Sequence, residues 1–230
     1  QCETNDLNQL LSVKEKTYTY DLNGNLIQES GPEGVKKFTY DALDRLIQII
    51  TPDHTLCYVH DEQNRCIAKN SDGTDSRYFY LGQAELGAVN DENVITELQV
   101  LGKGFRSEPC RAVAIELLGV PYIPIQDQSG HVRTLVDQRG ATLETYRYSS
   151  FGESLLFSKI SLNNPYRFAG KRFEAESGLI QFGRRFYSPE MGRFITKDPA
   201  GIDISPNLYA YLKNCPLAHY DAYGLFETSD

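Results

Sequence analysis

The sequence contains no tryptophan, a single methionine and no long run of apolar residues. No apolar run approaches the roughly 20 residues that a membrane-spanning helix needs, so no membrane span is expected. Residues 1–15 carry neither the basic stretch nor the apolar stretch of a secretory signal peptide, so none is expected there. Acidic residues outnumber basic ones by 31 to 23, and the resulting net charge of −8 argues against nonspecific binding to nucleic acid or to an anionic membrane.

Cysteines are few and scattered, and no two of them form a Cys-x-x-Cys pair. The five are Cys2, Cys57, Cys66, Cys110 and Cys215. A disulfide framework is therefore not expected, and packing of free thiols is the favoured interpretation. Cys57 and His60 have the spacing of metal ligands, but on a β-strand they would face opposite sides of the sheet, so the sequence does not predict a zinc site.

Motifs of conventional catalysis and cofactor binding are also missing. The stretch Gly102-Lys103-Gly104 lacks the pattern of a phosphate-binding loop. There is no Gly-x-Ser-x-Gly, and Ser129 and His131 have no evident third partner. The sequence therefore predicts no cofactor, no bound metal and no hydrolase that acts on external substrates.

Tyrosine, phenylalanine and glycine are abundant, with 15, 11 and 18 residues. This composition favours strands and turns over helices. The one stretch with a fair helical pattern is short and spans residues 107–119. We therefore expect an all-β fold.

Four similar segments follow one another at a fixed step of twenty residues. They read YTYDLNGNLI from residue 18, FTYDALDRLI from residue 38, YVHDEQNRCI from residue 58 and YFYLGQAELG from residue 78. Each reads as strand, tight turn and strand, and fixed self-similarity is typical of architectures in which each repeat buries its face against its neighbours. The predicted strands, paired antiparallel in chain order, are 17–22, 25–30, 37–41, 45–51, 56–60, 65–69 and 77–81.

Aligning the copies places equivalent residues in columns on one face of the predicted sheet. The aromatic columns are Tyr18, Phe38, Tyr58 and Tyr78, and then Tyr20, Tyr40, His60 and Tyr80. The column after the turn is Leu26, Leu46, Cys66 and Leu86. This alignment predicts that Cys66 is a core thiol. The acidic column is Asp21, Asp41 and Asp61, where we expect carboxylates that bond their own backbone and form turns rather than catalyse.

Changes in the residue pattern divide the chain into four predicted segments. Residues 1–90 hold the hairpin repeats, the fourth of which is degenerate. Residues 91–121 lack a clear period, and we expect them to form an irregular connecting segment with a strand pair and a short irregular or helical insertion. Residues 122–225 alternate apolar and polar residues punctuated by glycines, and residues 226–230 form a short end.

The second half carries strings that, together with the repeats, resemble a known family. The strings are FAGKRFEAESGL, RRFYSPEMGRFITKDP and NLYAYLKNCP. With the preceding YxYD segments, they resemble the YD-repeat (Rhs-repeat) proteins, which include bacterial Rhs effectors and the C component of Tc toxin complexes. Residues 18–87 resemble the repeats, and residues 122–225 resemble the repeat-associated core domain.

The resemblance implies a fold, a function and partners. Members wind long β-sheet ribbons into a hollow shell around a C-terminal polypeptide, often a toxic enzyme, and the core domain closes one end. This chain would be the C-terminal part of such a shell, in a bacterial protein that is secreted or delivered to a cell surface. Its partners would be the enclosed toxin or effector and upstream shell segments, with an immunity protein or secretion machinery as further ones. Four repeats are too few to enclose a folded toxin, so we expect either a missing upstream shell or a degenerate remnant.

The resemblance also implies a catalytic pair, because several members cut their own chain beyond the core domain in the manner of an aspartyl protease. The family motifs D-P-x-G and D-P-x-G-L fall on Asp198, Pro199 and Gly201, and on Asp221, Gly224 and Leu225, with Ala222 in place of the second proline. Asp198 and Asp221 would then be catalytic, and the cut would fall between Leu225 and Phe226. Of two close carboxylates, one serves as base for the attacking water while the other holds the proton that is donated.

Two further residues lie near this pair in the sequence. Arg193 is the expected charged neighbour, and His219 is expected to face solvent. Without the resemblance, both Asp198 and Asp221 would be interpreted as residues that cap turns.

Two interpretations of the whole chain are possible. It is either an encapsulating scaffold with one self-directed cut, or a structural or surface-adhesive module whose exposed tyrosines bind glycans or a partner protein.

Overall fold

The computed structural model describes residues 2–102, 111–156, 161–201 and 206–216. The first sixteen strands form one antiparallel sheet in chain order, here called the wall. They are β1 (Cys2–Thr4), β2 (Leu10–Val13), β3 (Lys16–Tyr20), β4 (Leu26–Gly31), β5 (Gly34–Tyr40), β6 (Leu46–Ile50), β7 (Thr55–His60), β8 (Cys66–Ser71), β9 (Thr74–Leu81), β10 (Ala84–Asn90), β11 (Ile95–Leu101), β12 (Ala112–Leu117), β13 (Val120–Gln126), β14 (Val132–Val136), β15 (Thr142–Tyr148) and β16 (Ser154–Leu156).

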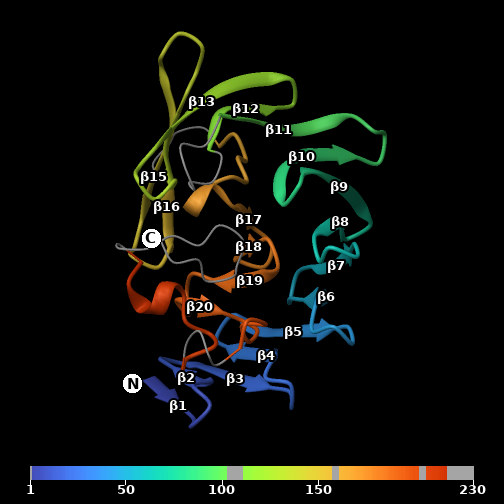
Figure 1. Cartoon of the computed structure of the whole chain (residues 1–230), viewed down its shortest axis with the longest axis vertical. Helices are drawn as coiled ribbons and strands as arrows, with labels where there is room; N and C mark the ends of the chain where they lie inside the picture. Colours follow the sequence, from blue (N-terminus) through green and yellow to red (C-terminus); the bar gives the residue numbers. More distant parts are fainter. Residues whose placement is uncertain (1, 103–110, 157–160, 202–205, 217–230) are drawn as a thin grey trace.

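The wall is bent by shifts in strand register that recur at the same place in successive repeats. In the first three repeats the register shifts immediately before Tyr20, Tyr40 and His60, where the facing strand holds one extra residue. An extra residue of this kind bends its strand and increases the local twist. Figure 1 shows the consequence, because the wall curls around the C-terminal part of the chain.

The strands predicted from the repeats are confirmed, and one expected element is wrong. Strands β3 to β9 lie at the seven predicted places, with ends that differ by up to three residues. The strand pair expected within residues 91–121 is present as β11 and β12. The helical pattern of residues 107–119 is wrong where the structure describes it, because Ala112–Leu117 forms β12 with Ile115 and Leu117 buried. The wall crosses residues 90 and 121 without a break, and the division of the chain into units there stays a prediction.

The first aromatic column lies on one face of the wall, as predicted, and the structure shows that this is the concave face. Tyr18, Phe38, Tyr58 and Tyr78 are only 4–6% exposed and share one apolar cluster. Cys66 belongs to the same cluster and is fully buried, and this burial raises the pKa of its thiol to about 12. Cys66 is therefore a neutral core residue, as the repeat alignment predicts.

The fourth repeat departs from the predicted column. Leu26, Leu46 and Cys66 lie opposite the second aromatic residue of their hairpins, but Glu85 and not Leu86 lies opposite Tyr80. The loop of this hairpin is one residue shorter, because residue 80 pairs with residue 85 where residue 60 pairs with residue 66. A shift of one residue moves a side chain to the other face of a sheet, so a carboxylate enters the concave face.

The acidic column forms turns and also links neighbouring repeats. The Asp41 carboxylate accepts hydrogen bonds from the backbone N–H groups of Leu43 and Arg45, at 2.9 and 3.0 Å. Arg45 donates to the Asp41 carboxylate at 2.7 Å and to the backbone carbonyl of Asp61, in the next repeat, at 3.0 Å. Arg65 repeats this arrangement with Asp61. The side chains at these turns therefore fix each hairpin and its distance from the next one.

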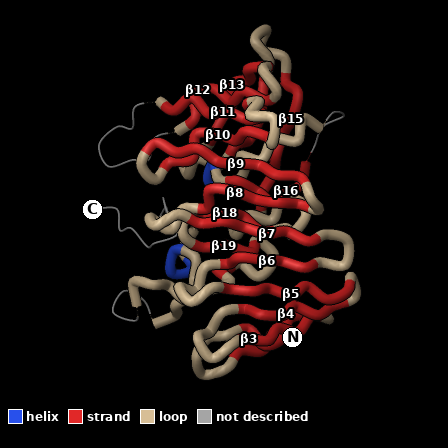
Figure 2. Tube along the Cα trace, turned by 90° about the vertical axis from the view of Figure 1, so that its right-hand side faces the viewer, coloured by secondary structure: helices blue, strands red, loops and turns tan. Residues whose placement is uncertain are grey.

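A second antiparallel sheet, here called the plug, fills the concave side of the wall. It consists of β17 (Arg172–Glu174), β18 (Leu179–Phe182), β19 (Arg185–Ser188) and β20 (Arg193–Phe194). On one face Leu179 and Phe186 pack against the aromatic column of the wall, and on the other Ile180, Phe182 and Tyr187 form a separate core. Figure 2 shows β18 and β19 at the height of wall strands β6 to β8.

Two short 3-10 helices, Phe168–Gly170 and Leu212–Asn214, flank the plug and contribute Phe168 and Leu212 to the core on its far face. Within the described ranges, no helix has the length and apolar character needed to cross a membrane.

Two tyrosines of the wall, the buried Tyr18 and the partly buried Tyr40, allow a matched test of its hydrogen bonding. The Tyr40 hydroxyl donates to the Leu26 carbonyl at 2.8 Å, whereas the Tyr18 hydroxyl has no hydrogen-bond partner among the described residues. We expect Tyr40→Phe to lower the free energy of unfolding by about 1–2 kcal/mol, because a buried carbonyl loses its donor, and Tyr18→Phe to leave it nearly unchanged. Urea unfolding of both variants measures this difference, and equal losses would contradict it.

Candidate functional site

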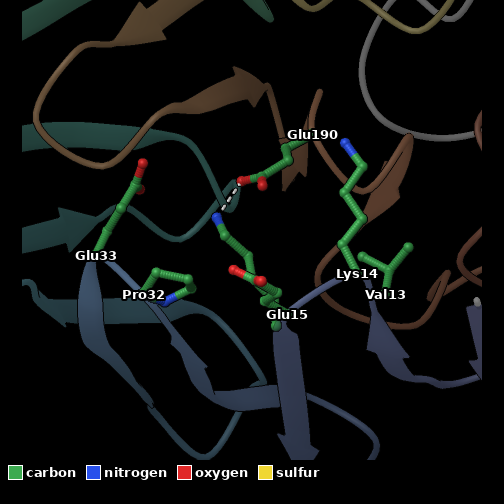
Figure 3. A pocket seen from close by; sticks show the side chains of 7 residues that line it. Val13, Lys14, Glu15, Pro32, Glu33 and Glu190 are labelled. Carbon is green, nitrogen blue, oxygen red and sulfur yellow. Dashed lines mark hydrogen bonds and ion pairs between the residues drawn. The ribbon is translucent and has the colours of Figure 1, made fainter.

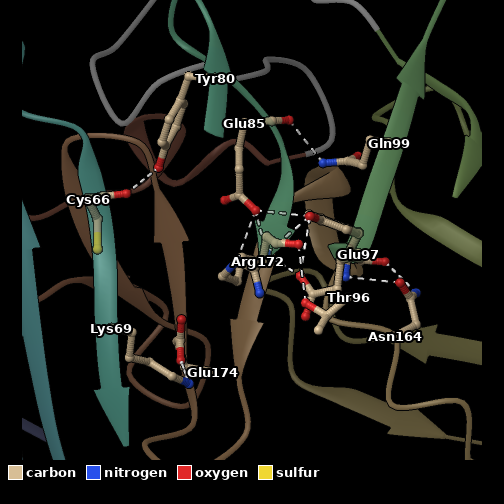
Figure 4. Close-up of polar contacts among 12 residues, drawn as sticks. Cys66, Lys69, Tyr80, Glu85, Thr96, Glu97, Gln99, Asn164, Arg172 and Glu174 are labelled. Carbon is tan, nitrogen blue, oxygen red and sulfur yellow. Dashed lines mark hydrogen bonds and ion pairs between the residues drawn. The ribbon is translucent and has the colours of Figure 1, made fainter. Parts of the chain in front are cut away.

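A buried arginine joins the plug to the wall where the fourth repeat is irregular. Arg172 of β17 donates to Glu85 at 2.5 Å and to Glu97, which lie on adjacent wall strands (Figure 4). It also donates to the Tyr166 hydroxyl at 3.1 Å. Its guanidinium carbon also lies 4.4 Å from the ring centre of Tyr78. One cation therefore holds β10, β11 and the plug together, and the carboxylate that it requires is supplied by the shortened hairpin.

Further ion pairs join earlier repeats to the same sheet. Lys69 of β8 lies 2.5 Å from Glu174 and 3.0 Å from Glu176, as Figure 4 shows for the first pair. Burial raises the pKa of Glu174, and the nearby ammonium of Lys69 opposes this rise. Lys16 of β3 contacts Glu29 at 3.0 Å and Glu190 beyond the plug strand β19 at 2.6 Å. Charged contacts thus run along the boundary from the first repeat to the fourth.

A groove opens beside the Lys16 pair. It has a volume of about 430 Å³ and is lined by Val13, Lys14, Glu15, Lys16, Pro32, Glu33 and Glu190 (Figure 3). Lys16 is already engaged by two carboxylates, and the described residues of the lining include no cysteine, histidine or serine that could act as a nucleophile or base. Asp198, the described member of the predicted catalytic pair, does not line the groove.

Asp198, the first predicted catalytic residue, lies in a turn after β20. Its side chain is 11% exposed and contacts the Arg185 guanidinium at 2.8 Å. The other carboxylate oxygen accepts from the backbone N–H of Ala200 at 2.9 Å, and the backbone N–H of Asp198 donates to the Leu208 carbonyl at 2.9 Å. The turn and the ion pair together fix the carboxylate in one orientation.

The charged partner of Asp198 is Arg185 and not the expected Arg193. Arg185 is 3% exposed, and its guanidinium carbon lies 3.6 Å from the ring centre of Phe194. Arg193 instead donates to the backbone carbonyl of Asn8 in the wall at 2.8 Å. The sequence does not point to Arg185, because no short spacing links it to Asp198. The pairing of β19 with β20 brings it beside the Asp198 turn.

The second half of the predicted catalytic site cannot be placed. Asp221, Leu225, Phe226 and His219 lie outside the described residues. The structure therefore brings Asp198 together with Arg185 and leaves its relation to Asp221 as a prediction.

His131 and His60, which the sequence places near Ser129 and Cys57, pack as structural residues. His131 accepts a hydrogen bond from the backbone N–H of Ala169 and stacks on Phe168 at 4.2 Å between ring centres. His60 replaces the tyrosine of the second aromatic column, and burial lowers its pKa to about 4. Within the described ranges, no group of three His, Cys, Asp or Glu side chains is arranged to hold a metal ion.

Comparison with known proteins gives a family and several relatives. The family model of the Teneurin YD-shell matches residues 1–215. The tRNA nuclease WapA of Bacillus subtilis (strain 168) is 28% identical over 228 residues, which cover 96% of this chain and 10% of that protein. The toxin protein Tse5 of Pseudomonas aeruginosa is 46% identical over 61 residues, 26% of this chain and 5% of that protein. The chain spans about a tenth of the length of WapA.

Solved structures share the fold. The crystal structure of TcdB2-TccC3 matches with a TM-score of 0.63 and 21% identity, over 91% of this chain and 14% of that chain. The Tc holotoxin pore of Photorhabdus luminescens matches with a TM-score of 0.61 and 17% identity, over all of this chain and 15% of that chain. The long antiparallel sheet of this protein therefore has the architecture found in those toxins.

The partial burial of His60 makes the free energy of unfolding depend on pH. Its ring holds a proton more weakly in the folded protein, where the pKa is about 4, than in the unfolded chain, where it is about 6.5. Folding stability should therefore fall by about 1–3 kcal/mol as the pH drops from 6.5 toward 4. We expect His60→Tyr, the residue of the other repeats, to remove most of this loss.

Urea unfolding at several pH values measures the effect, with His54→Gln as the control. The hydrogen bond to Asp72 raises the pKa of the exposed His54, so that residue acts in the opposite direction. An unchanged acid dependence in His60→Tyr would contradict the assignment.

Proposed function

Since this chain belongs to the Teneurin YD-shell family, we propose that it forms the C-terminal part of a spiralling β-shell that encloses a polypeptide and releases it. The observation that carries this proposal is the curled wall with its own plug. The wall strands follow one another in chain order, and the plug covers the concave face that an open sheet would expose. Residues 122–225 would act as the core domain that closes one end of the shell.

The names of relatives support a toxic cargo. WapA is named a tRNA nuclease and Tse5 a toxin protein, and this chain matches a small part of each. We infer that the enclosed polypeptide is a toxin or effector that follows this segment, in a protein that is secreted or delivered to other cells. Upstream shell strands would be its other partner.

The second part of the proposal is a single self-directed cut between Leu225 and Phe226. The Asp198 carboxylate, held by Arg185, would accept a proton from water as the water oxygen bonds to the Leu225 carbonyl carbon. Asp221 in its acid form would donate a proton to the Phe226 nitrogen as the peptide bond breaks. One water is consumed, and a carboxylate and an amine result. Ala222 lacks the rigidity of the family proline and is expected to slow this step.

The adhesive alternative, in which exposed tyrosines bind glycans or a partner protein, gains no support from the first aromatic column. Tyr18, Tyr58 and Tyr78 are only 4–6% exposed, in the cluster that the plug covers. A passive shell without cleavage is a further alternative, and the following experiment separates it from the shell that cuts itself.

We expect the full-length protein to appear as two chains in denaturant and as one particle in native buffer. Intact-mass spectrometry locates the cut, and size-exclusion chromatography with and without denaturant reports whether the cargo stays enclosed. Asp198→Asn and Asp221→Asn should leave one uncut chain in a particle of the same size, because cleavage loses about 10²–10⁴-fold in rate without its acid or base.

Each other outcome has a distinct meaning. An uncut wild-type chain, or variants that cut equally well, would exclude the protease assignment and leave a passive shell. Cut fragments that separate in native buffer would exclude enclosure.

A further inference from the structure

The segments on either side of the Asp198 turn contact the N-terminal end of the wall, and two of the contacts join residues that are 185 apart in the chain. The backbone N–H of Leu26 donates to the Ile195 carbonyl at 2.9 Å, and Arg193 donates to the Asn8 carbonyl at 2.8 Å. The buried Tyr209 hydroxyl donates to the Gly24 carbonyl at 2.7 Å. The β20 end of the plug is therefore fixed to two loops of the wall.

Tyr209 connects this contact to Asp198. Its backbone carbonyl accepts from the N–H of Phe194 at 3.0 Å, and the carbonyl of the preceding residue, Leu208, accepts from the N–H of Asp198 at 2.9 Å. Leu208 also accepts from Arg185 at 3.3 Å, the residue that orients the Asp198 carboxylate. A displacement of Tyr209 by the wall would thus move both the Asp198 backbone and its arginine partner.

Gly24 shows that the wall is shaped for this contact. It has φ +89°, and the equivalent residues of the next two repeats, Asp44 and Asn64, adopt φ +58° and +65° with side chains. A positive φ therefore does not by itself require glycine at this turn. A Cβ on Gly24 would lie 2.2 Å from the Lys197 side chain and 2.6 Å from the Tyr209 hydroxyl. The Tyr209 hydroxyl and the Lys197 side chain, and not the hairpin itself, crowd a side chain here.

We propose that the first repeat, through Gly24 and Tyr209, positions Asp198 for self-cleavage, so that the cut is made only after the wall has folded around the plug. This inference rests on the proposed function. It makes the wall a requirement for cleavage, which delays release of the cargo from the chain until this end of the shell is closed.

The test compares two asparagine substitutions in the full-length protein. Gly24→Asn introduces the residue that the third repeat carries, and Gly140→Asn is its control. Gly140 closes the same kind of Asp-initiated turn with φ +81°, and a Cβ there meets nothing within 4 Å. We expect Gly24→Asn to slow cleavage about 10²-fold, a cost typical of ångström-scale misplacement, and Gly140→Asn to cut at the wild-type rate.

A second pair of variants controls for an effect of reduced stability on the cleavage rate. Tyr209→Phe removes the hydroxyl that donates to Gly24 and accepts from Gln9, and Tyr187→Phe removes the hydroxyl of an equally buried tyrosine, which donates to the Phe151 carbonyl at 2.7 Å. Both should lower the thermal midpoint similarly, but only Tyr209→Phe should slow cleavage. The rate is followed by mass spectrometry beside the thermal midpoint of each variant.

The outcomes distinguish the inference from the proposed function. If wild type is not cut, the protease assignment fails. If wild type is cut and Gly24→Asn and Tyr209→Phe cut equally fast, the wall does not position Asp198 and this inference is wrong. Equal slowing of each variant and its control would also overturn it, because the effect would then follow stability alone.

Discussion

The apolar concave face of the wall is the constraint on which the rest of the structure depends. Every repeat contributes an aromatic side chain to that face, and such a surface is stable in water only when something covers it. The plug provides the cover with Leu179 and Phe186, and its other face forms a second core with Phe168 and Tyr211. A sheet built from local hairpins thus depends on strands more than a hundred residues away.

Charged residues at this boundary specify how the two sheets meet. An apolar face alone would accept the plug at several positions along the wall, because the repeats are similar. A buried guanidinium is tolerated only where carboxylates meet it, and Arg172 finds Glu85 and Glu97 at one place. Together with the ion pairs of Lys16 and Lys69, this contact at the irregular fourth hairpin favours one register, in which the plug also contacts the first repeat.

Local features of the sequence predicted much of the wall, and features that depend on distant contacts were missed. The period of twenty residues and strand alternation placed β3 to β9, the buried tyrosines and Cys66. Leu86 was assigned to the core because a fixed alignment cannot show that a hairpin loop has lost a residue. The segment Ala112–Leu117 has apolar residues at spacings that suit either a helix or a strand, and pairing with β11 and β13 decided for the strand. Arg185 was missed because only the folded plug brings it beside Asp198.

The central claim is that wall and plug form one cooperative unit, and native-state hydrogen exchange tests it most directly. Amides of β6 and β7 in the wall and of β18 and β19 in the plug should exchange through openings of equal free energy, and these free energies should fall together as denaturant is added. Plug amides that exchange through a lower-energy opening, while wall amides stay protected, would show that the wall is stable without its cover. That result would contradict the account.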